Sequence, residues 1–242
     1  MWLALPPGDV PAISGDRPGF LNSSTLVPLG GTQIETGLSF ARGGAPDLVT
    51  TPVALRYGLR DDLELRASTS GWNRADEQGA PDESGWGPLT LGVKAPLDRH
   101  FADLDLTHAD SAAWVAEVTL PTGTFAPDST SPVFNLSGVA SWTPAQSAWQ
   151  CCGTAGLTWA PGQDSLVLDL ALSGTLPLGG PTSLYLESGY FPGLHTESDP
   201  LFVGAGLIAL PSTDVQLDLT FDLGLGEASG SWTAGVGLCW RW

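Results

Sequence analysis

The stretch at residues 214–242 constrains the fold more than any other part of the chain. Apolar and polar residues alternate over 215–223, and after a polar turn they alternate again over 232–242. A period of two residues is the pattern of a β-strand with one apolar and one polar face. The apolar face of the last strand begins at Trp232 and ends at Trp242. The stretch therefore predicts a β-hairpin whose apolar face has aromatic rings at both ends.

Such a face is typical of a transmembrane β-barrel, which sets an apolar band with aromatic girdles against lipid and a polar face toward the lumen. A soluble β-sandwich is the alternative, because its half-buried strands alternate in the same way. Only 14% of the residues are charged, against about 25% in a typical soluble domain. No apolar run approaches the ~20 residues of a transmembrane helix. We therefore predict an all-β fold, a transmembrane antiparallel up-and-down β-barrel.

The same alternation predicts about twelve strands after Thr32. They are expected at 32–41, 49–58, 62–72, 86–97, 112–121, 132–143, 146–159, 164–176, 181–191, 200–210, 213–224 and 231–242. Twelve is even, as in bacterial single-chain barrels, and the lengths suit the ~9–11 residues of a spanning strand. Residues 32–242 are thus expected to form the barrel.

Residues 1–31 are expected to form an irregular N-terminal segment, because prolines and glycines interrupt every possible strand. We expect this segment to fold into the lumen as a plug or to cover the periplasmic mouth. Residues 1–7 (MWLALPP) are too short for a signal peptide and lack its basic residues, so we expect a mature chain behind an added or re-assigned Met1.

Loop lengths predict the orientation if the C-terminus is periplasmic. The connections expected inside are mostly short, and they fall at 59–61, 144–145, 178–180 and 211–212. Those expected outside are longer, at 73–85, 122–131 and 192–199. The long connection at 98–111 is the exception on the inner side. Trp and Tyr then gather at both ends of the strands, as they do at membrane interfaces.

Charge and cysteine content limit the partners. With a net charge of -17 and only 9 Lys and Arg residues, we expect no nucleic-acid partner. Cys151, Cys152 and Cys239 lack zinc spacing, and we expect no metal and no cofactor. Cys151 should face lipid and Cys152 the lumen, as small filling residues, with a vicinal disulfide or redox switch as the alternative. Outer-membrane lipid and a small-molecule solute are the expected partners, and no feature specifies an oligomeric state.

The polar faces define a candidate site. With apolar faces turned to lipid, a set of polar residues faces the lumen: Gln33, Glu35, Arg56, Glu64, Arg66, Lys94, Glu117, Asp169, Glu187, Asp218, Asp222 and Arg241. Seven of them form the candidate constriction or solute-binding site: Glu35, Arg56, Glu64, Arg66, Lys94, Glu117 and Arg241. Because buried charges must be paired, a purely structural ion-pair network is the alternative.

The sequence indicates no enzyme. It lacks the G-x-S-x-G, H-E-x-x-H and P-loop motifs. An outer-membrane hydrolase remains an alternative only through His195 near Ser188 or Ser198, and no third residue is evident to orient the histidine. His100 and His108, in the long inner connection, are expected to be solvated.

Several segments carry a family resemblance: 33–40 (QIETGLSF), 54–61 (ALRYGLRD), 63–66 (LELR), 85–94 (GWGPLTLGVK), 120–123 (LPTG) and 16–20 (DRPGF). In their order along the chain they resemble the bacterial outer-membrane β-barrel family named for putative transporters of the meta-pathway of phenol degradation. The resemblance implies a barrel in the bacterial outer membrane that passes small, often hydrophobic compounds. The chain ends in Trp242, where outer-membrane barrels commonly end in Phe.

A twelve-stranded barrel lies between the filled interior of eight strands and the water channel of sixteen. We therefore expect an outer-membrane channel or transporter with restricted or gated passage. A membrane-anchored structural or interaction barrel with a sealed lumen is the alternative.

Overall fold

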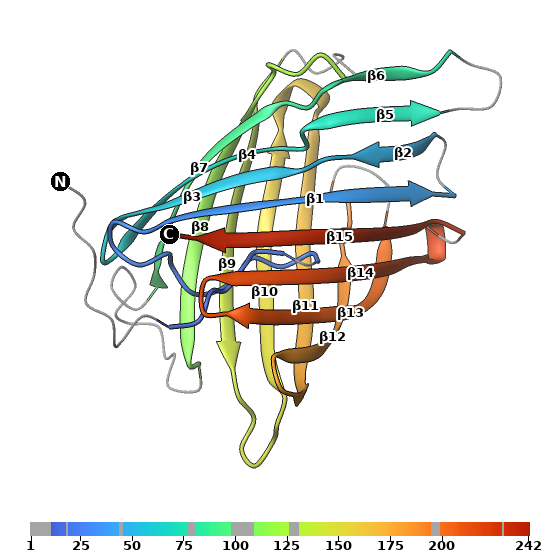
Figure 1. Ribbon diagram of the computed structural model, residues 1–242. Helices are drawn as coiled ribbons and strands as arrows, with labels where there is room; N and C mark the ends of the chain where they lie inside the picture. The colour runs from blue at the N-terminus through green and yellow to red at the C-terminus, as the bar shows by residue number, and fades with distance from the viewer. Residues whose placement is uncertain are drawn as a thin grey trace.

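The computed structural model describes residues 11–17, 19–43, 46–76, 81–97, 109–125, 131–194, 199–228 and 230–242. In these ranges the chain forms a single antiparallel sheet that closes on itself (Figure 1). Its strands are β1 (Thr32–Arg42), β2 (Asp47–Thr50), β3 (Val53–Arg60), β4 (Leu63–Thr69), β5 (Trp72–Asp76), β6 (Glu83–Trp86), β7 (Leu89–Pro96), β8 (Ser111–Leu120), β9 (Val133–Trp142), β10 (Gln150–Ala160), β11 (Ser165–Gly179), β12 (Thr182–Tyr190), β13 (Leu201–Ser212), β14 (Val215–Leu225) and β15 (Trp232–Arg241). Within the same ranges, no helix is long and apolar enough to cross a membrane.

The fifteen strands of the described ranges amount to twelve transmembrane strands, because three of the twelve are interrupted. β2 and β3 both pair with β1, so they are two parts of one strand. In the next strand, β5 pairs with β2 and β4 pairs with β3. In the strand after that, β6 pairs with β5 and β7 pairs with β4. The interruptions fall at Pro52, Gly71 and Pro88, where proline has no N–H to donate and Gly71 has a positive φ of 70°. Fifteen less three gives the predicted twelve.

The barrel closes between its first and last strands. β1 and β15 are antiparallel, with register from Gln33 opposite Arg241 to Arg42 opposite Trp232. Closure removes the free strand edges that lipid does not tolerate. The predicted antiparallel transmembrane barrel is confirmed, and the alternative of a soluble two-layer sandwich is wrong.

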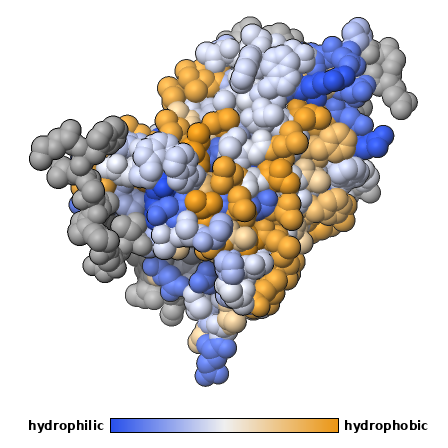
Figure 2. Space-filling model, in the orientation of Figure 1, coloured by the Kyte–Doolittle hydropathy of each residue, from blue (hydrophilic) through white to orange (hydrophobic). Residues whose placement is uncertain are grey.

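The distribution of polar side chains is the reverse of that in a soluble protein. Arg56, Glu64 and Lys94 are at most 1% exposed and point into the barrel, whereas Leu136 and Leu219 are more than half exposed on its outer surface. On the side of the outer surface that Figure 2 shows, apolar side chains gather over the middle. An apolar surface of this extent has to be covered, and a lipid bilayer covers it.

Exposed aromatic residues form pairs at both ends of the wall. Trp72 and Trp86 lie edge to face with ring centroids 5.9 Å apart, and Phe134 stacks on Trp159 at 5.7 Å. At the other end the rings of Trp240 and Trp242 are 4.9 Å apart. Their positions are those of the aromatic girdles that the sequence predicts.

Two predicted connections differ from the structure. The connection predicted at 73–85 contributes residues to β5 and β6, because Trp72 pairs with Trp86 and Asn73 with Gly85. The two-residue turn predicted at 144–145 is a longer loop, and β10 begins only at Gln150. Gln146 there has a positive φ of 61°, and the Ser147 N–H donates to the carbonyl of Pro144 at 3.0 Å.

Candidate functional site in the barrel lumen

The described residues between 11 and 31, called the lumen segment below, run inside the barrel and leave it at the end of β3, where Leu29 and Gly30 lie against Gly58 (blue in Figure 1). An irregular chain in an enclosed space still has to satisfy its backbone N–H and C=O groups. Side chains of the barrel wall do this. Gln33, for example, donates from Nε2 to the Ser14 carbonyl at 3.2 Å, and Gln216 donates to the Arg17 carbonyl at 2.8 Å. The wall thus binds the main chain of the segment directly.

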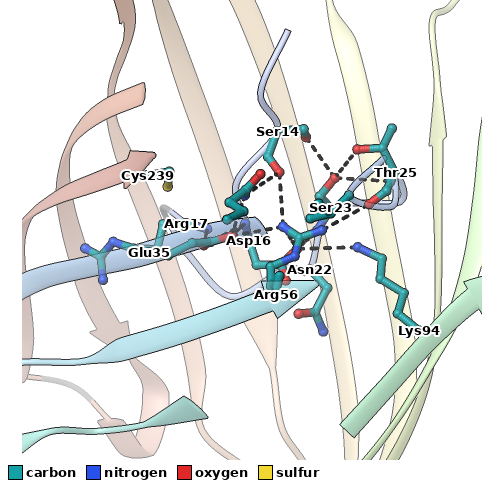
Figure 3. A network of polar contacts seen from close by, with 12 residues as sticks. Ser14, Asp16, Arg17, Asn22, Ser23, Thr25, Glu35, Arg56, Lys94 and Cys239 are labelled. Atoms are coloured by element: carbon teal, nitrogen blue, oxygen red, sulfur yellow. Dashed lines mark hydrogen bonds and ion pairs between the residues drawn. The ribbon is translucent and has the colours of Figure 1, made fainter. Parts of the chain in front are cut away.

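Asp16 is the centre of the charged contacts between the lumen segment and the wall (Figure 3). Its Oδ2 lies 2.6 Å from Nη1 of Arg66, and its Oδ1 lies 3.3 Å from Nη1 of Arg56. Lys94 Nζ is 3.5 Å from the same Oδ1, and the Ser23 N–H donates to it at 2.7 Å. One carboxylate therefore connects cations from three strands, β3, β4 and β7.

Arg56 binds the lumen segment and the wall together. Its Nε donates to Glu64 at 2.8 Å and its Nη1 to Glu35 at 2.9 Å. The same guanidinium donates to the carbonyls of Ser14 and Thr25, both at 3.1 Å. The planar fork of arginine, with five donors, suits such a site in a way that lysine would not.

The carboxylates of the wall also accept backbone hydrogen bonds from the segment. Glu35 accepts from the N–H groups of Asp16 and Arg17 at 3.0–3.2 Å. Glu64 Oε2 accepts from the Val27 N–H at 2.8 Å. Each carboxylate is thus shared between an arginine of the wall and the backbone of the segment, which are charge-assisted bonds.

The register explains where the charge of Asp16 acts. Arg56 on β3 lies directly opposite Arg66 on β4, and like charges opposite each other destabilise a sheet. Arg66 is balanced by Glu117 on β8, with Nε 3.1 Å from Oε1, and by Asp16. The segment therefore supplies a negative charge between two arginines of the wall.

The protonation of Asp16 follows from these neighbours. Burial alone would raise the pKa of this carboxyl group. Arg56, Arg66 and Lys94 act in the opposite direction and outweigh burial, so the pKa of Asp16 lies well below its usual range. Asp16 is therefore ionised at neutral pH.

The wall formed by β12, β13 and β14 is different, with acidic residues and glycines. Glu187 accepts a hydrogen bond from the Phe20 N–H at 2.8 Å. Asp218 has Arg17 at 3.4 Å. Glu187 and Asp222 lie on either side of Gly204, where there is no room for a Cβ atom. This wall contacts the segment through separate bonds to Arg17 and Phe20, without the shared carboxylate that the other wall has.

Glycines let the lumen segment approach the wall at β1 and β15. A Cβ atom at Gly37 would be 2.9 Å from Cζ of Arg17, and one at Gly237 would be 2.3 Å from its Nε. At Gly15 a Cβ atom would lie 2.6 Å from Sγ of Cys239. The segment thus lies directly against the backbone of the wall.

The structure brings six of the seven predicted site residues together: Glu35, Arg56, Glu64, Arg66, Lys94 and Glu117. Arg241 faces inward as predicted but lies elsewhere. It pairs with Asp214 at 2.7 Å and donates to the carbonyl of Pro11 at 2.7 Å. Asp16 is not among the seven predicted site residues, although the family resemblance includes its segment at 16–20.

The remaining predictions concern cysteines, histidines and metals. Cys152 faces the lumen, with Sγ 3.8 Å from the Asn22 carbonyl, and all three cysteines are free thiols. His100, His108, His195 and Ser198 lie outside the described residues, so the hydrolase alternative stays untested. In the described part of the chain no three His, Cys, Asp or Glu side chains are grouped to hold a metal ion.

A closed barrel with an apolar outer surface and a polar, occupied lumen defines the class: this is a transmembrane β-barrel protein of the outer-membrane type. A family model described as "Putative MetA-pathway of phenol degradation" matches residues 15–242. The chain belongs to this family, and the predicted resemblance and outer-membrane location are confirmed. Among curated proteins, none matches the chain.

Solved structures of outer-membrane channels share the fold. An outer membrane channel from Pseudomonas putida F1 is 15% identical, with 99% of this chain and 100% of that chain covered and a TM-score of 0.65. The NanC porin is 8% identical, over 86% and 98% of the two chains, with a TM-score of 0.60. The KdgM porin in complex with disordered oligogalacturonate is also 8% identical, over 86% and 98%, with a TM-score of 0.59.

Proposed function

We propose that this protein is an outer-membrane channel for restricted passage of small molecules with apolar surface, and that the lumen segment limits the passage. The observation that carries the proposal is the ion-pair hub, the cluster of Asp16 with Glu35, Arg56, Glu64, Arg66, Lys94 and Glu117. In the hub, Asp16 fixes the segment across the lumen to three cations of the wall. A segment held in this way reduces the free cross-section of a barrel that is already narrow.

The charges of the hub argue against an anionic solute. Arg56, Arg66 and Lys94 are each within 3.5 Å of a carboxylate oxygen. Four carboxylates, those of Asp16, Glu35, Glu64 and Glu117, surround these three cations. In this cluster no cation is left free to bind an anion, so an uncharged solute meets the smallest electrostatic barrier. The family description, with its reference to phenol degradation, supports the same class of small molecule.

Single-channel conductance in a planar bilayer tests the proposal, with the full chain compared with a chain that begins at Gly31. Without the segment, Arg56 keeps its partners Glu35 and Glu64, so the wall stays balanced. We expect current to appear or to rise several-fold in the shorter chain.

The control is the folded state of both barrels, shown by the faster migration of unheated samples in gel electrophoresis. No current from either folded barrel would favour the sealed structural barrel over a channel. Equal, substantial current from both would show that the segment does not limit passage.

A further inference from the structure

A cavity of about 410 Å³ lies between the lumen segment and the wall formed by β8 to β14. This volume is within the range of small-molecule sites. The cavity is lined by Ser14, Asn22 and Ser23 of the segment and by strand residues that include Ser173 and Ser183. It lies beside the ion-pair hub and contains none of the predicted site residues.

The lining suits an amphipathic molecule. The lining combines hydroxyl groups, among them those of Ser111, Ser141 and Thr175, with apolar side chains such as Ile13 and Ile208. Hydroxyl groups both donate and accept hydrogen bonds, so they match a ligand hydroxyl in either direction.

The two charged residues of the lining leave the interior without a free charge. Asp110 lies at the rim, where its Oδ2 accepts from the Thr143 hydroxyl at 2.8 Å. Arg17 is turned toward the wall, with Nη2 3.4 Å from Asp218. A charged ligand would lose its hydration there without a partner charge.

Tyr185 contributes ring surface to the cavity and is 3% exposed. Its hydroxyl oxygen is buried over Gly206, where a Cβ atom would be 2.8 Å from it, so the oxygen does not face the cavity. The hydroxyl groups that a ligand can reach are those of serines and threonines, among them Ser173, Ser183 and Thr175.

We propose that this cavity is a binding site for a small uncharged molecule with an apolar body and a hydroxyl group, which it bonds through serine and threonine hydroxyls and packs against the Tyr185 ring. The inference deepens the proposed function, on which it rests, by naming the class of solute and a site beside the hub. Aliphatic or aromatic ring alcohols have this chemistry.

A native cysteine reports on occupancy. Cys152 lines the cavity and is part-exposed, whereas Cys239 is fully buried. Cys151 is its neighbour in sequence and also lines the cavity, so the full-length Cys151→Ser variant is the starting protein. The test measures the rate at which a small neutral methanethiosulfonate modifies Cys152 in detergent micelles, read by peptide mass spectrometry.

Four probes of similar size separate the alternatives: cyclohexanol, methylcyclohexane, cyclohexanecarboxylate and cyclohexylammonium. We expect cyclohexanol to slow the modification at least about fivefold and saturably, and the other three to slow it less than about twofold. Equal protection by a charged probe or by methylcyclohexane would overturn the proposal. An unreactive Cys152 in the folded barrel would overturn it too, because the cavity would then be closed to solutes.

Ser183→Ala is the informative variant, and Ser188→Ala on the opposite face of β12 is its matched control. Loss of one hydrogen bond should raise the half-protecting concentration of cyclohexanol about fivefold in Ser183→Ala and leave it unchanged in Ser188→Ala. Unchanged protection in Ser183→Ala would contradict the assigned role of its hydroxyl. Conductance separates the two proposals: protection without any current refutes passage alone, and current without protection refutes the cavity alone.

Discussion

The two sides of the lumen hold the same segment in different ways. The wall of β3, β4 and β7 binds it through buried ion pairs, with Arg56, Glu64 and Lys94 at most 1% exposed. The wall of β12, β13 and β14 holds it through separate hydrogen bonds to the backbone and one ion pair at 3.4 Å, and a cavity of about 410 Å³ lies between the segment and the strands β8 to β14. Both walls therefore hold the segment, but the buried ion-pair cluster lies on one of them, and space for a solute remains along the other.

This difference follows from the side chains on each wall. Arginines opposite each other on β3 and β4 require carboxylates between them, and Asp16 of the segment provides one. The glycines and serines on β8 to β13 have small side chains, so the cavity remains between these strands and the segment. An anchor on one side and space on the other is an arrangement that restricts passage without filling the lumen.

The largest effect is expected when the anchored wall loses Arg56. Arg56→Ala leaves the carboxylates of Glu35 and Glu64 buried without their arginine. Removal of one partner of a buried pair costs about 3–5 kcal/mol. Chemical unfolding of the barrel in micelles measures the loss. Arg60→Ala, which breaks the exposed pair with Asp62, is the control and should cost about 0.5 kcal/mol or less. Similar losses for both variants would contradict the anchoring role of Arg56.

The same substitution on the two walls sharpens the comparison. Glu64→Gln weakens two bonds from Arg56, at 2.8 and 3.0 Å, and should cost about 2 kcal/mol of unfolding free energy. Glu187→Gln keeps an oxygen for the Phe20 N–H and removes a charge beside Asp222, so it should cost about 0.5 kcal/mol or less. Equal costs in unfolding experiments would show that the walls do not differ.

A smaller effect is expected from pH. The folded pKa of Asp16 lies below its unfolded value of about 3.9, so the unfolded chain takes up a proton first as pH falls. The stability that Asp16 contributes is complete above that value and declines below it, by at most about 1.4 kcal/mol per pH unit. Asp16→Asn should therefore lose less stability than the natural chain between pH 5 and pH 3. Parallel curves for the two proteins would contradict this.

The fold was predictable because alternation fixes which face of each strand meets lipid. The pattern of 215–223 placed Leu217 and Leu219 outside and Asp218 inside, as found. The same rule found six members of the hub, since a polar residue on an inward face must meet other inward residues. The interruptions at Pro52 and Pro88 lie within the strands that alternation predicts as continuous at 49–58 and 86–97.

Asp16 was not predictable in this way. Its segment has no periodicity, so no rule assigns its side chain to a face. Its partners are far away in sequence, with Arg66 fifty residues further on and Lys94 beyond it. For Arg241, alternation correctly predicted that the side chain faces the lumen, but not how far along the barrel axis it lies, where Asp214 is its partner. The position along the axis depends on strand tilt and register, and alternation determines neither.

The most direct test of the central claim uses a disulfide to lock the lumen segment in the full-length barrel. Gly15→Cys would place its Cβ atom 2.6 Å from Sγ of Cys239, so a small shift allows a disulfide between the segment and β15. Cys151 and Cys152 are replaced by serine to leave one pairing, and single-channel current is recorded before and after a reductant is added.

If the segment limits passage, the oxidised barrel should conduct least and the reductant should raise its current reversibly, with no such change in the serine-substituted parent. The same current in both states, with the disulfide confirmed by mass spectrometry, would contradict the claim that this segment controls passage.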